Sequence, residues 1–585
     1  MMKRTVVIAM YKGIGVSQGI AVNKAFVLRE TQIGHYELEY APADSVTEWR
    51  KLQQAMDESR REIKKIREQN KYLSADEMWI FDAHLTILDD PLIHNELKLL
   101  VEQQKKSALH AVREVINHFQ QMFEKMEDEY MRERAQDLRD IGNRLTRNIL
   151  GQKTEELPDD EPYILFASEI SPSLMAQLDP QQVQAIVATH GNRTSHVSII
   201  ARALGIPYVV RVDERLEQTI RSGDVLAVDG NRGIVAHNPD DEERLQFEFL
   251  WQQFQTYKEK LSRLKNVSAE TEDGYVIELL ANISAIYELD VAVEQNAAGI
   301  GLYRSEYLFM ERASAPDEEE QYAVYRKLLA SLPGKPVTIR TIDIGGDKHA
   351  PCLPLPKEDN PFLGLRAIRF SLKHPLLLRI QLRAILRASA HGPLKLLMPM
   401  VSSLEEVIQF KRILTEVKDE LRTAVVAFDE QIPLGVMVEV PAVALIMPEL
   451  ASEVDFFSIG TNDLAQYMLA ADRMNEHVAH VYDPYHPAMI RLLAIVCKAA
   501  EEHGKPVSVC GEMASELLAL PLWVALGVHE LSMSASHLLQ VKETVRSLRK
   551  QECRHIFEQL LACRTAEQNR NLLEEAKQIW KQRQQ

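Results

Sequence analysis

One histidine of this sequence stands where a phosphoryl group could be carried. The segment AIVATHGNRTSHVSII (185–200) reads as a buried strand, a polar loop and the start of a helix, with Thr194 or Ser195 suited to the N-cap and His196 in the first turn. Free N–H groups and the helix dipole attract an anion there, and neutral imidazole is a good nucleophile. His196 is therefore the candidate carrier. His190 is a competing candidate, and a histidine that only packs or caps is the alternative reading.

Three arginines follow or end apolar runs in the second half of the chain. They are Arg304 in GLYRSEYLFM, Arg340 in IRTIDIGGDK and Arg473 in AADR. A guanidinium binds phosphate or carboxylate through two parallel hydrogen bonds and stays charged at any working pH. Their type and position predict a site for a small polyanion.

Two carboxylates lie in comparable positions. Glu439 ends the run LGVMVE, and Asp463 lies in IGTND after FFSI. An all-oxygen pair without histidine or cysteine suits Mg²⁺ or Mn²⁺. A metal held there would neutralise negative charge that develops on a leaving group.

Cys510 closes the run PVSVC, just before Gly511 and Glu512. A lone cysteine is most often a buried structural thiol. Because this one ends a strand, and a thiol can titrate near working pH, a role in proton transfer is the second interpretation.

The elements that must position these residues alternate between short buried-type strands and helices. Eight strands are expected, near 275–281, 299–303, 336–342, 394–400, 434–438, 454–459, 507–510 and 529–533. Eight β/α units over about 300 residues predict a (β/α)8 barrel of the TIM type, whose active site lies at the carboxyl ends of the strands. The polar residues above, together with Asn462, stand at those ends.

The first half of the chain has a different pattern. Apolar residues recur at three- to four-residue steps from about 45 to 150, which predicts a bundle of about four helices. Strand-like segments flank it, at 13–28 and between 160 and 240, so the bundle reads as an insertion into a small α/β domain. Residues 241–265 form one amphipathic pattern, which predicts a linker helix.

Composition excludes several classes of protein. The chain has 585 residues, 46% hydrophobic and 26% charged, which is too long for one core but ordinary for a globular protein. A formal charge of −17 argues against non-specific binding of nucleic acid. Five cysteines without a CxxC pair suggest reduced thiols, and no window approaches a membrane span. We expect a cytoplasmic protein without membrane insertion.

Several motifs, in this order along nearly the whole chain, resemble Enzyme I of the bacterial phosphotransferase system. They are GNRTSHVSIIAR, GIGLYRSEYLFM, RTIDIGGDK, NPFLGLRAIR, GVMVEVPA, VDFFSIGTNDLAQY and VCGEMA. The resemblance implies transfer of a phosphoryl group from phosphoenolpyruvate (PEP) to His196, then to a histidine of the carrier protein HPr, with release of pyruvate, as the first step of sugar uptake.

The resemblance also implies a role for each candidate residue. Arg304, Arg340, Asn462 and Arg473 would hold PEP, together with the two carboxylates. Glu439 and Asp463 would bind Mg²⁺, with Mn²⁺ a possible substitute, and Cys510 would donate the proton that turns enolpyruvate into pyruvate.

The domains implied by the motifs divide the chain four ways. Residues 1–35 and 153–240 would form the phosphohistidine domain, and 36–152 the helical insertion that binds HPr, including DAHLTILDD (82–90). Residues 241–268 would form the linker, and 269–585 the PEP-binding barrel, through which the family forms homodimers.

Some positions depart from the family pattern. Asn192 stands where the second of two glycines is usual, and Ser305, Val440, Ala465 and Met474 replace threonine or glycine. None of these changes removes a charge or the nucleophile. They bear on the rate and on the choice of acceptor.

Two other readings compete. Pyruvate phosphate dikinase and PEP synthase need a nucleotide-binding domain of several hundred residues, which we do not expect in the segment before the histidine loop, since most of it reads as the helical bundle. A regulatory phosphotransfer protein, or a catalytically impaired scaffold that binds HPr-like partners, remains the alternative.

Overall fold

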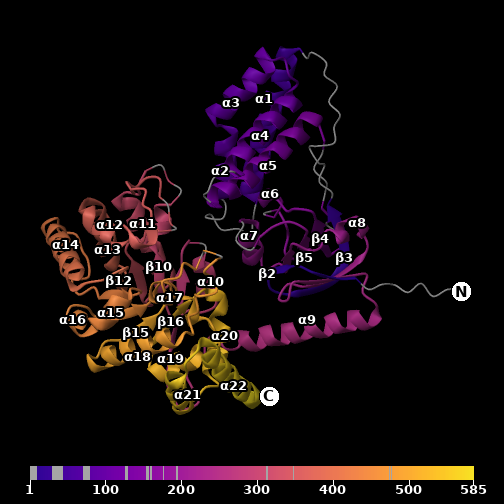
Figure 1. Cartoon of the computed structure of the whole chain (residues 1–585). Coiled ribbons are helices and arrows are strands. Elements are labelled where there is room, and N and C mark those ends of the chain that lie inside the picture. Colours follow the sequence, from indigo (N-terminus) through magenta and orange to yellow (C-terminus); the bar gives the residue numbers. More distant parts are fainter. Residues whose placement is uncertain are drawn as a thin grey trace. The chain divides into compact units, whose positions relative to one another are not determined.

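The chain forms two compact units, Met1–Lys258 and Glu259–Gln585, which are described separately (Figure 1). The computed structural model describes residues 9–28, 44–69, 79–124, 129–152, 157–158, 161–175, 177–192, 196–286, 288–310, 312, 314–346, 348, 350–473, 475 and 477–584.

The first unit is built on an eight-stranded sheet in the order β1-β8-β7-β3-β4-β5-β6-β2. Neighbours β3, β4, β5 and β6 are parallel, whereas the flanking pairs are antiparallel. The strands are β1 Ala9–Lys12, β2 Ile14–Ser17, β3 Ile20–Leu28, β4 Tyr163–Ala167, β5 Val183–Ala188, β6 Tyr208–Val210, β7 Val225–Asp229 and β8 Ile234–His237. Short helices lie between them: α6 Pro172–Met175, α7 His196–Leu204 and α8 Arg215–Thr219.

A helical insertion separates β3 from β4, as the sequence predicts. It contains α1 Ser45–Gln69, α2 Trp79–Leu88, α3 Pro91–Lys98, the π-helical turn η1 Leu99–Gln103, α4 Ala108–Glu124 and α5 Glu129–Leu150. The predicted apolar stripes bury Leu52, Ile116 and Ile141 in one core. Val46, which the same periodicity includes, is 68% exposed, because it lies in the first turn of α1, before the packed part of the helix.

The predicted linker helix is α9, Asp241–Ser262. Phe247 of α9 packs with Ile20, Ala227 and Ala236 of the sheet, and Leu250 and Phe254 border the same cluster. The boundary between the two units falls within this helix.

The second unit is a closed barrel of eight parallel strands in the order β10-β11-β12-β13-β14-β15-β16-β9. The strands are β9 Glu278–Ile283, β10 Ile300–Arg304, β11 Val337–Arg340, β12 Leu394–Met398, β13 Leu434–Val438, β14 Phe456–Ile459, β15 Val507–Val509 and β16 Glu530–Met533. All eight predicted strands are confirmed. The first begins three residues later than predicted, because Glu270 and Val276 pair across a turn that occupies the expected start.

Helices surround this barrel, and their loops at the carboxyl ends of the strands carry the polar residues. They are α10 Glu288–Glu294, η2 Ser305–Leu308, α11 Glu318–Ser331, η3 Pro361–Leu363, α12 Ile368–Lys373, α13 Pro375–Ser389, α14 Leu404–Thr423, α15 Pro441–Leu445, α16 Met447–Ala451, α17 Thr461–Leu469, α18 Pro487–Glu502, η4 Glu512–Ala514, α19 Leu520–Leu526, η5 Ala535–His537, α20 Leu538–Val545, α21 Lys550–Ala562 and α22 Ala566–Gln584. The connection after β11 is long, from 341 to 367, and supplies several buried charges. None of the helices in the described part of the chain is long and apolar enough to cross a membrane.

Candidate active site

The predicted barrel residues lie at the carboxyl ends of the strands. Arg304 and Arg340 are the last residues of β10 and β11, and Glu439 directly follows β13. Asp463 lies in the first turn of α17, which follows β14, and Cys510 follows β15. Parallel strands of a closed barrel end at the same face, so these side chains share one site.

A cluster of charged residues lies at this face: Glu306, Arg340, Asp343 and Arg366, which are buried, and Lys348, whose side chain is 20% exposed. Glu306 Oε1 accepts from Arg340 Nη2 (2.5 Å) and Lys348 Nζ (2.6 Å). Asp343 Oδ2 lies 3.1 Å from Arg340 Nη2 and accepts from Lys348 Nζ at 3.0 Å. Glu306 and Asp343 are completely buried, and burial opposes their ionisation. The adjacent cations overcome that effect and lower the pKa of both carboxyls, so the acids stay charged.

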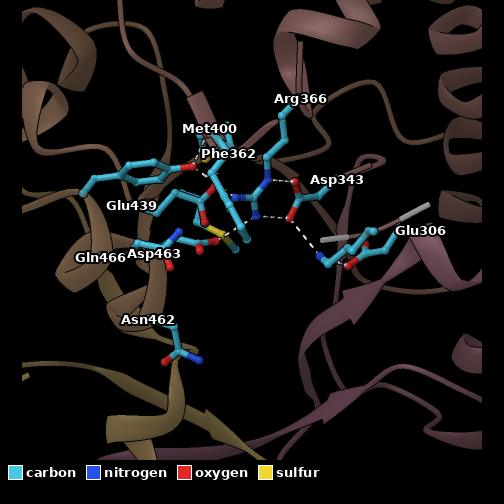
Figure 2. Close-up of polar contacts among 12 residues, drawn as sticks. Glu306, Asp343, Phe362, Arg366, Met400, Glu439, Asn462, Asp463 and Gln466 are labelled. Carbon is cyan, nitrogen blue, oxygen red and sulfur yellow. Dashed lines mark hydrogen bonds and ion pairs between the residues drawn. The ribbon is translucent and has the colours of Figure 1, made fainter. Parts of the chain in front are cut away.

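Arg366 joins this cluster to Asp463. Its Nε and Nη2 donate to the two oxygens of Asp343, at 2.9 and 3.1 Å, and Nη2 also donates to Asp463 Oδ2 at 2.9 Å. Nη1 donates to the hydroxyl of Tyr467 (3.1 Å). Figure 2 shows the guanidinium between the two carboxylates. Arg366 is only 2% exposed, so these pairs are shielded from water.

Glu439 is held by a backbone group on the neighbouring strand end. The N–H of Met400 donates to Glu439 Oε1 at 2.5 Å, and Met400 adopts a positive φ of 55°. Burial, together with the charges of Asp463 and Asp343, raises the pKa of Glu439 to about 8. These effects disfavour the ionised form of Glu439, and a nearby cation would favour it.

Glu439 and Asp463 fit the predicted divalent cation in part. Within the described residues, no group of three or more His, Cys, Asp or Glu side chains could hold a metal ion. Asp463 Oδ1 is, however, buried without a hydrogen-bond partner among those residues. Mg²⁺ commonly takes one or two carboxylates and completes its shell with substrate oxygens and water. The two carboxylates are suited to that mode of binding. They are too few to surround a metal ion with protein ligands alone.

Cys510 is 3% exposed and packs in a cluster with Leu302 and Met437. Ser458 donates a hydrogen bond to its sulfur (3.3 Å), and the thiol faces the carbonyl of Ile459 (3.7 Å). Burial raises the pKa of Cys510, although Ser458 opposes the shift. The expectation that this thiol titrates near working pH is therefore wrong. The raised pKa keeps the thiol protonated before the reaction, as a proton donor requires.

Asn462 and Arg473 border the same site. Asn462 Nδ2 donates to Glu512 Oε1, and its Oδ1 accepts from the N–H of Glu512, each at 2.9 Å. Arg473 lies beyond the end of α17, where its N–H donates to Gln466 Oε1 (3.2 Å). The side chain of Asn462 is therefore fixed, and Arg473 is anchored through its backbone.

Sequence reasoning missed Glu306, Asp343, Lys348 and Arg366, although all four lie inside motifs that it singled out. Acidic residues close in sequence to Arg304 and Arg340 could have indicated the two carboxylates. Glu306 stands two residues after Arg304, and Asp343 three residues after Arg340.

The predicted histidine lies in the first unit, where α7 begins at His196 directly after the loop that follows β5. Its side chain, and residues Arg193, Thr194 and Ser195, lie outside the described part. Ser198 in the first turn of α7 donates to the carbonyl of Asn192 (2.5 Å), and Gly191 takes a positive φ of 130°. The positive φ in this loop is thus adopted by Gly191, the residue before Asn192.

His190 has different surroundings. Its side chain is 56% exposed, and Nδ1 lies 3.1 Å from the hydroxyl of Thr189 and 3.3 Å from that of Ser168. It precedes the helix and so lacks the first-turn position of His196.

Comparisons with known proteins agree with this arrangement. Three family models match in order: PEP-utilising enzyme, N-terminal (residues 12–134), mobile domain (159–233) and PEP-binding domain (258–550). A phosphoenolpyruvate-protein phosphotransferase of Staphylococcus carnosus (strain TM300) is 42% identical, over 96% of this chain and 98% of its own.

Two further relatives bear the same name. That of Geobacillus stearothermophilus is 42% identical, over 95% of this chain and 96% of its own, and that of Listeria monocytogenes serovar 1/2a (strain EGD-e) is 40% identical, over 96% and 98%. The resemblance inferred from the motifs is confirmed: the chain belongs to the family of phosphoenolpyruvate-protein phosphotransferases.

Proposed function

We propose that this chain takes the phosphoryl group of PEP onto His196 and passes it to a histidine of the carrier protein HPr, releasing pyruvate. The observation that carries the proposal is that Arg304 and Arg340 end neighbouring strands at the face of the barrel where the carboxylates Glu439 and Asp463 also lie. Such a site suits a small polyanion, and the first unit supplies the nucleophile. The expected setting is the first step of sugar uptake, in the cytoplasm.

In the first half-reaction, a nitrogen of His196 attacks phosphorus, and the bond from phosphorus to the enol oxygen breaks. The enolate of pyruvate is left in the barrel. Arg304, Arg340, Asn462 and Arg473 bind and orient PEP, and the fixed positive charges of the three arginines stabilise the negative charge that moves onto the enol oxygen. Mg²⁺ or Mn²⁺, held by Glu439 and Asp463, would add charge neutralisation when bound.

Cys510 then gives its proton to the methylene carbon of the enolate, which forms the methyl group of pyruvate. Burial keeps this thiol protonated, as a donor requires. The thiolate that remains takes up a proton from water as the site opens.

In the second half-reaction, a histidine of HPr attacks the phosphoryl group on His196 and restores the free imidazole. The helical insertion, 36–152, is the proposed docking site. At the corner between α2 and α3 the carboxylate of Asp90 caps α3 by accepting from Leu92 N (2.7 Å), and Leu92 is 66% exposed. This corner therefore presents an apolar side chain to solvent.

The remaining boundaries follow the same division. Residues 1–35 and 153–240 form the phosphohistidine domain, 241–268 the linker, and 269–585 the PEP-binding barrel and the homodimer contact. Because PEP and HPr must both reach His196, α9 is expected to allow two arrangements of the units.

Labelling with PEP carrying radioactive phosphorus tests the proposal. In the presence of Mg²⁺ the protein should acquire one acid-labile, base-stable label, and added HPr should remove it. Absence of label, or label that HPr cannot remove, would contradict the proposed function.

A further inference from the structure

Arg366 occupies one of the two carboxylates assigned to the metal. Its Nη2 lies 2.9 Å from Asp463 Oδ2, and the other side-chain oxygen of Asp463, Oδ1, has no hydrogen-bond partner among the described residues. Both side chains are withdrawn from water, with Arg366 2% and Asp463 8% exposed. The guanidinium therefore neutralises the charge of Asp463.

The same guanidinium has a second, independent anchor. Nε donates to Asp343 Oδ1 (2.9 Å), and Nη2 is shared between Asp343 Oδ2 (3.1 Å) and Asp463. Arg366 can thus give up Asp463 and keep its bond from Nε to Asp343. Release of Asp463 breaks one charged hydrogen bond, and the side chain of Arg366 stays in place through its bond to Asp343.

The backbone that carries Arg366 is fixed. Ala367 is completely buried and has a positive φ of 53°, and its N–H donates to the carbonyl of Ile344 (3.0 Å). A Cβ on Gly345 would lie 3.0 Å from the Cα of Arg366, so the two segments are in close contact. A positive φ is unfavourable for alanine, so the surrounding contacts must hold this segment in place. Any movement of the guanidinium must come from rotation of its side chain.

We propose that Arg366 is a positioning residue that blocks Asp463 in the empty enzyme and releases it to the divalent cation only when an anionic substrate takes over the guanidinium. This inference rests on the proposed function. A cation on Asp463 with Arg366 still in place would put a guanidinium beside a doubly charged ion in a buried site, where repulsion is strong. The phosphate or carboxylate of the substrate offers the guanidinium a replacement partner, so substrate and metal favour each other's binding.

Binding of Mn²⁺ alone, followed by electron paramagnetic resonance on the full-length protein without PEP, tests this directly. R366Q should bind Mn²⁺ about tenfold more tightly than the unmodified protein, within the usual range of coupling between sites. R340Q is the matched control, because it removes a guanidinium of the same cluster whose ion pairs are with Glu306 and Asp343. It should tighten binding by clearly less, since it leaves Asp463 blocked.

A double-mutant cycle localises the effect to one carboxylate. In D463N/R366Q the gain should disappear, because the blocked ligand is no longer present. If R366Q fails to fold, as judged by its thermal melt, R366K gives the same test. A single ammonium can stay with Asp343 but cannot bridge to Asp463, so R366K should also tighten Mn²⁺ binding.

The outcomes separate this inference from the proposed function. If D463N leaves Mn²⁺ binding unchanged with PEP present, the metal site itself is wrong. If D463N abolishes that binding but R366Q and R366K bind Mn²⁺ no more tightly than R340Q does, the metal site stands and the blocking role of Arg366 is overturned.

Discussion

The two units hold their functional residues in different ways. In the barrel, Arg340, Asp343 and Arg366 are buried and tied to one another, so the position of each depends on its neighbours. In the first unit, His196 begins a helix after a loop, and a hydrogen bond from Ser198 to the carbonyl of Asn192 links the first turn to that loop. The barrel residues form one connected set of ion pairs that can hold a substrate, whereas the start of α7 presents a single reactive group. A substitution in the barrel should therefore also disturb the neighbouring site residues, whereas a substitution of His196 should affect that residue's own function alone.

The largest single effect is expected in the histidine unit. H196A should abolish labelling by radioactive PEP, because the nucleophile is lost, while PEP binding to the barrel, measured by calorimetry, should stay unchanged. H190A is the matched control and should label normally. Undiminished label in H196A would move the carrier elsewhere, with His190 the first suspect.

In the barrel, removal of a carboxylate assigned to the metal should be nearly as severe. E439A or D463A should reduce turnover at least about 100-fold, the scale of losing a major charge-stabilising group. The measurement is the rate of pyruvate release with Mg²⁺ in excess, with the fold checked by circular dichroism. Near-normal rates in the presence of EDTA would rule out the divalent metal.

Substitution of an acid that touches no substrate tests the coupling in the barrel. E306Q leaves Arg340 and Lys348 without a charged partner on one side, so the KM for PEP should rise about tenfold, the scale of a lost charged hydrogen bond. The control is E530Q, which breaks a 2.7 Å pair with Lys395 at the amino ends of the strands. It should affect thermal stability but leave the KM unchanged. If E306Q and E530Q changed the KM equally, the role of Glu306 would be structural only.

Removal of the proton donor should have a smaller effect, confined to the rate. C510A should slow pyruvate release but leave the affinity for PEP nearly unchanged, because the thiol acts on the enolate and not on the ground state. C497A, in which another buried thiol is removed, serves as the control. A parallel loss of affinity and rate in C510A would assign the residue to packing.

The sequence predicted the fold well, because parallel barrel strands are continuous apolar runs that end at polar residues. Arg340, Glu439 and Asp463 stand out for that reason, and the structure brings them to one face. The buried partners were not predicted: Arg366 reaches Asp463 across 97 positions of sequence. No local pattern records such a contact. The sequence did not reveal that the pKa of Cys510 is raised, because burial of the thiol depends on neighbours from other strands.

Division of the chain tests most directly the claim that one unit binds PEP and the other accepts the phosphoryl group. A cut after Ser262, where α9 ends, keeps Phe247 packed on the sheet of the first unit and leaves the barrel whole. Fragment 1–262 should exchange phosphate with phosphorylated HPr yet remain unlabelled by PEP, and fragment 263–585 should bind PEP and Mg²⁺ and form dimers. Labelling of isolated 1–262 by PEP would contradict the account, because it would place the PEP site in the first unit.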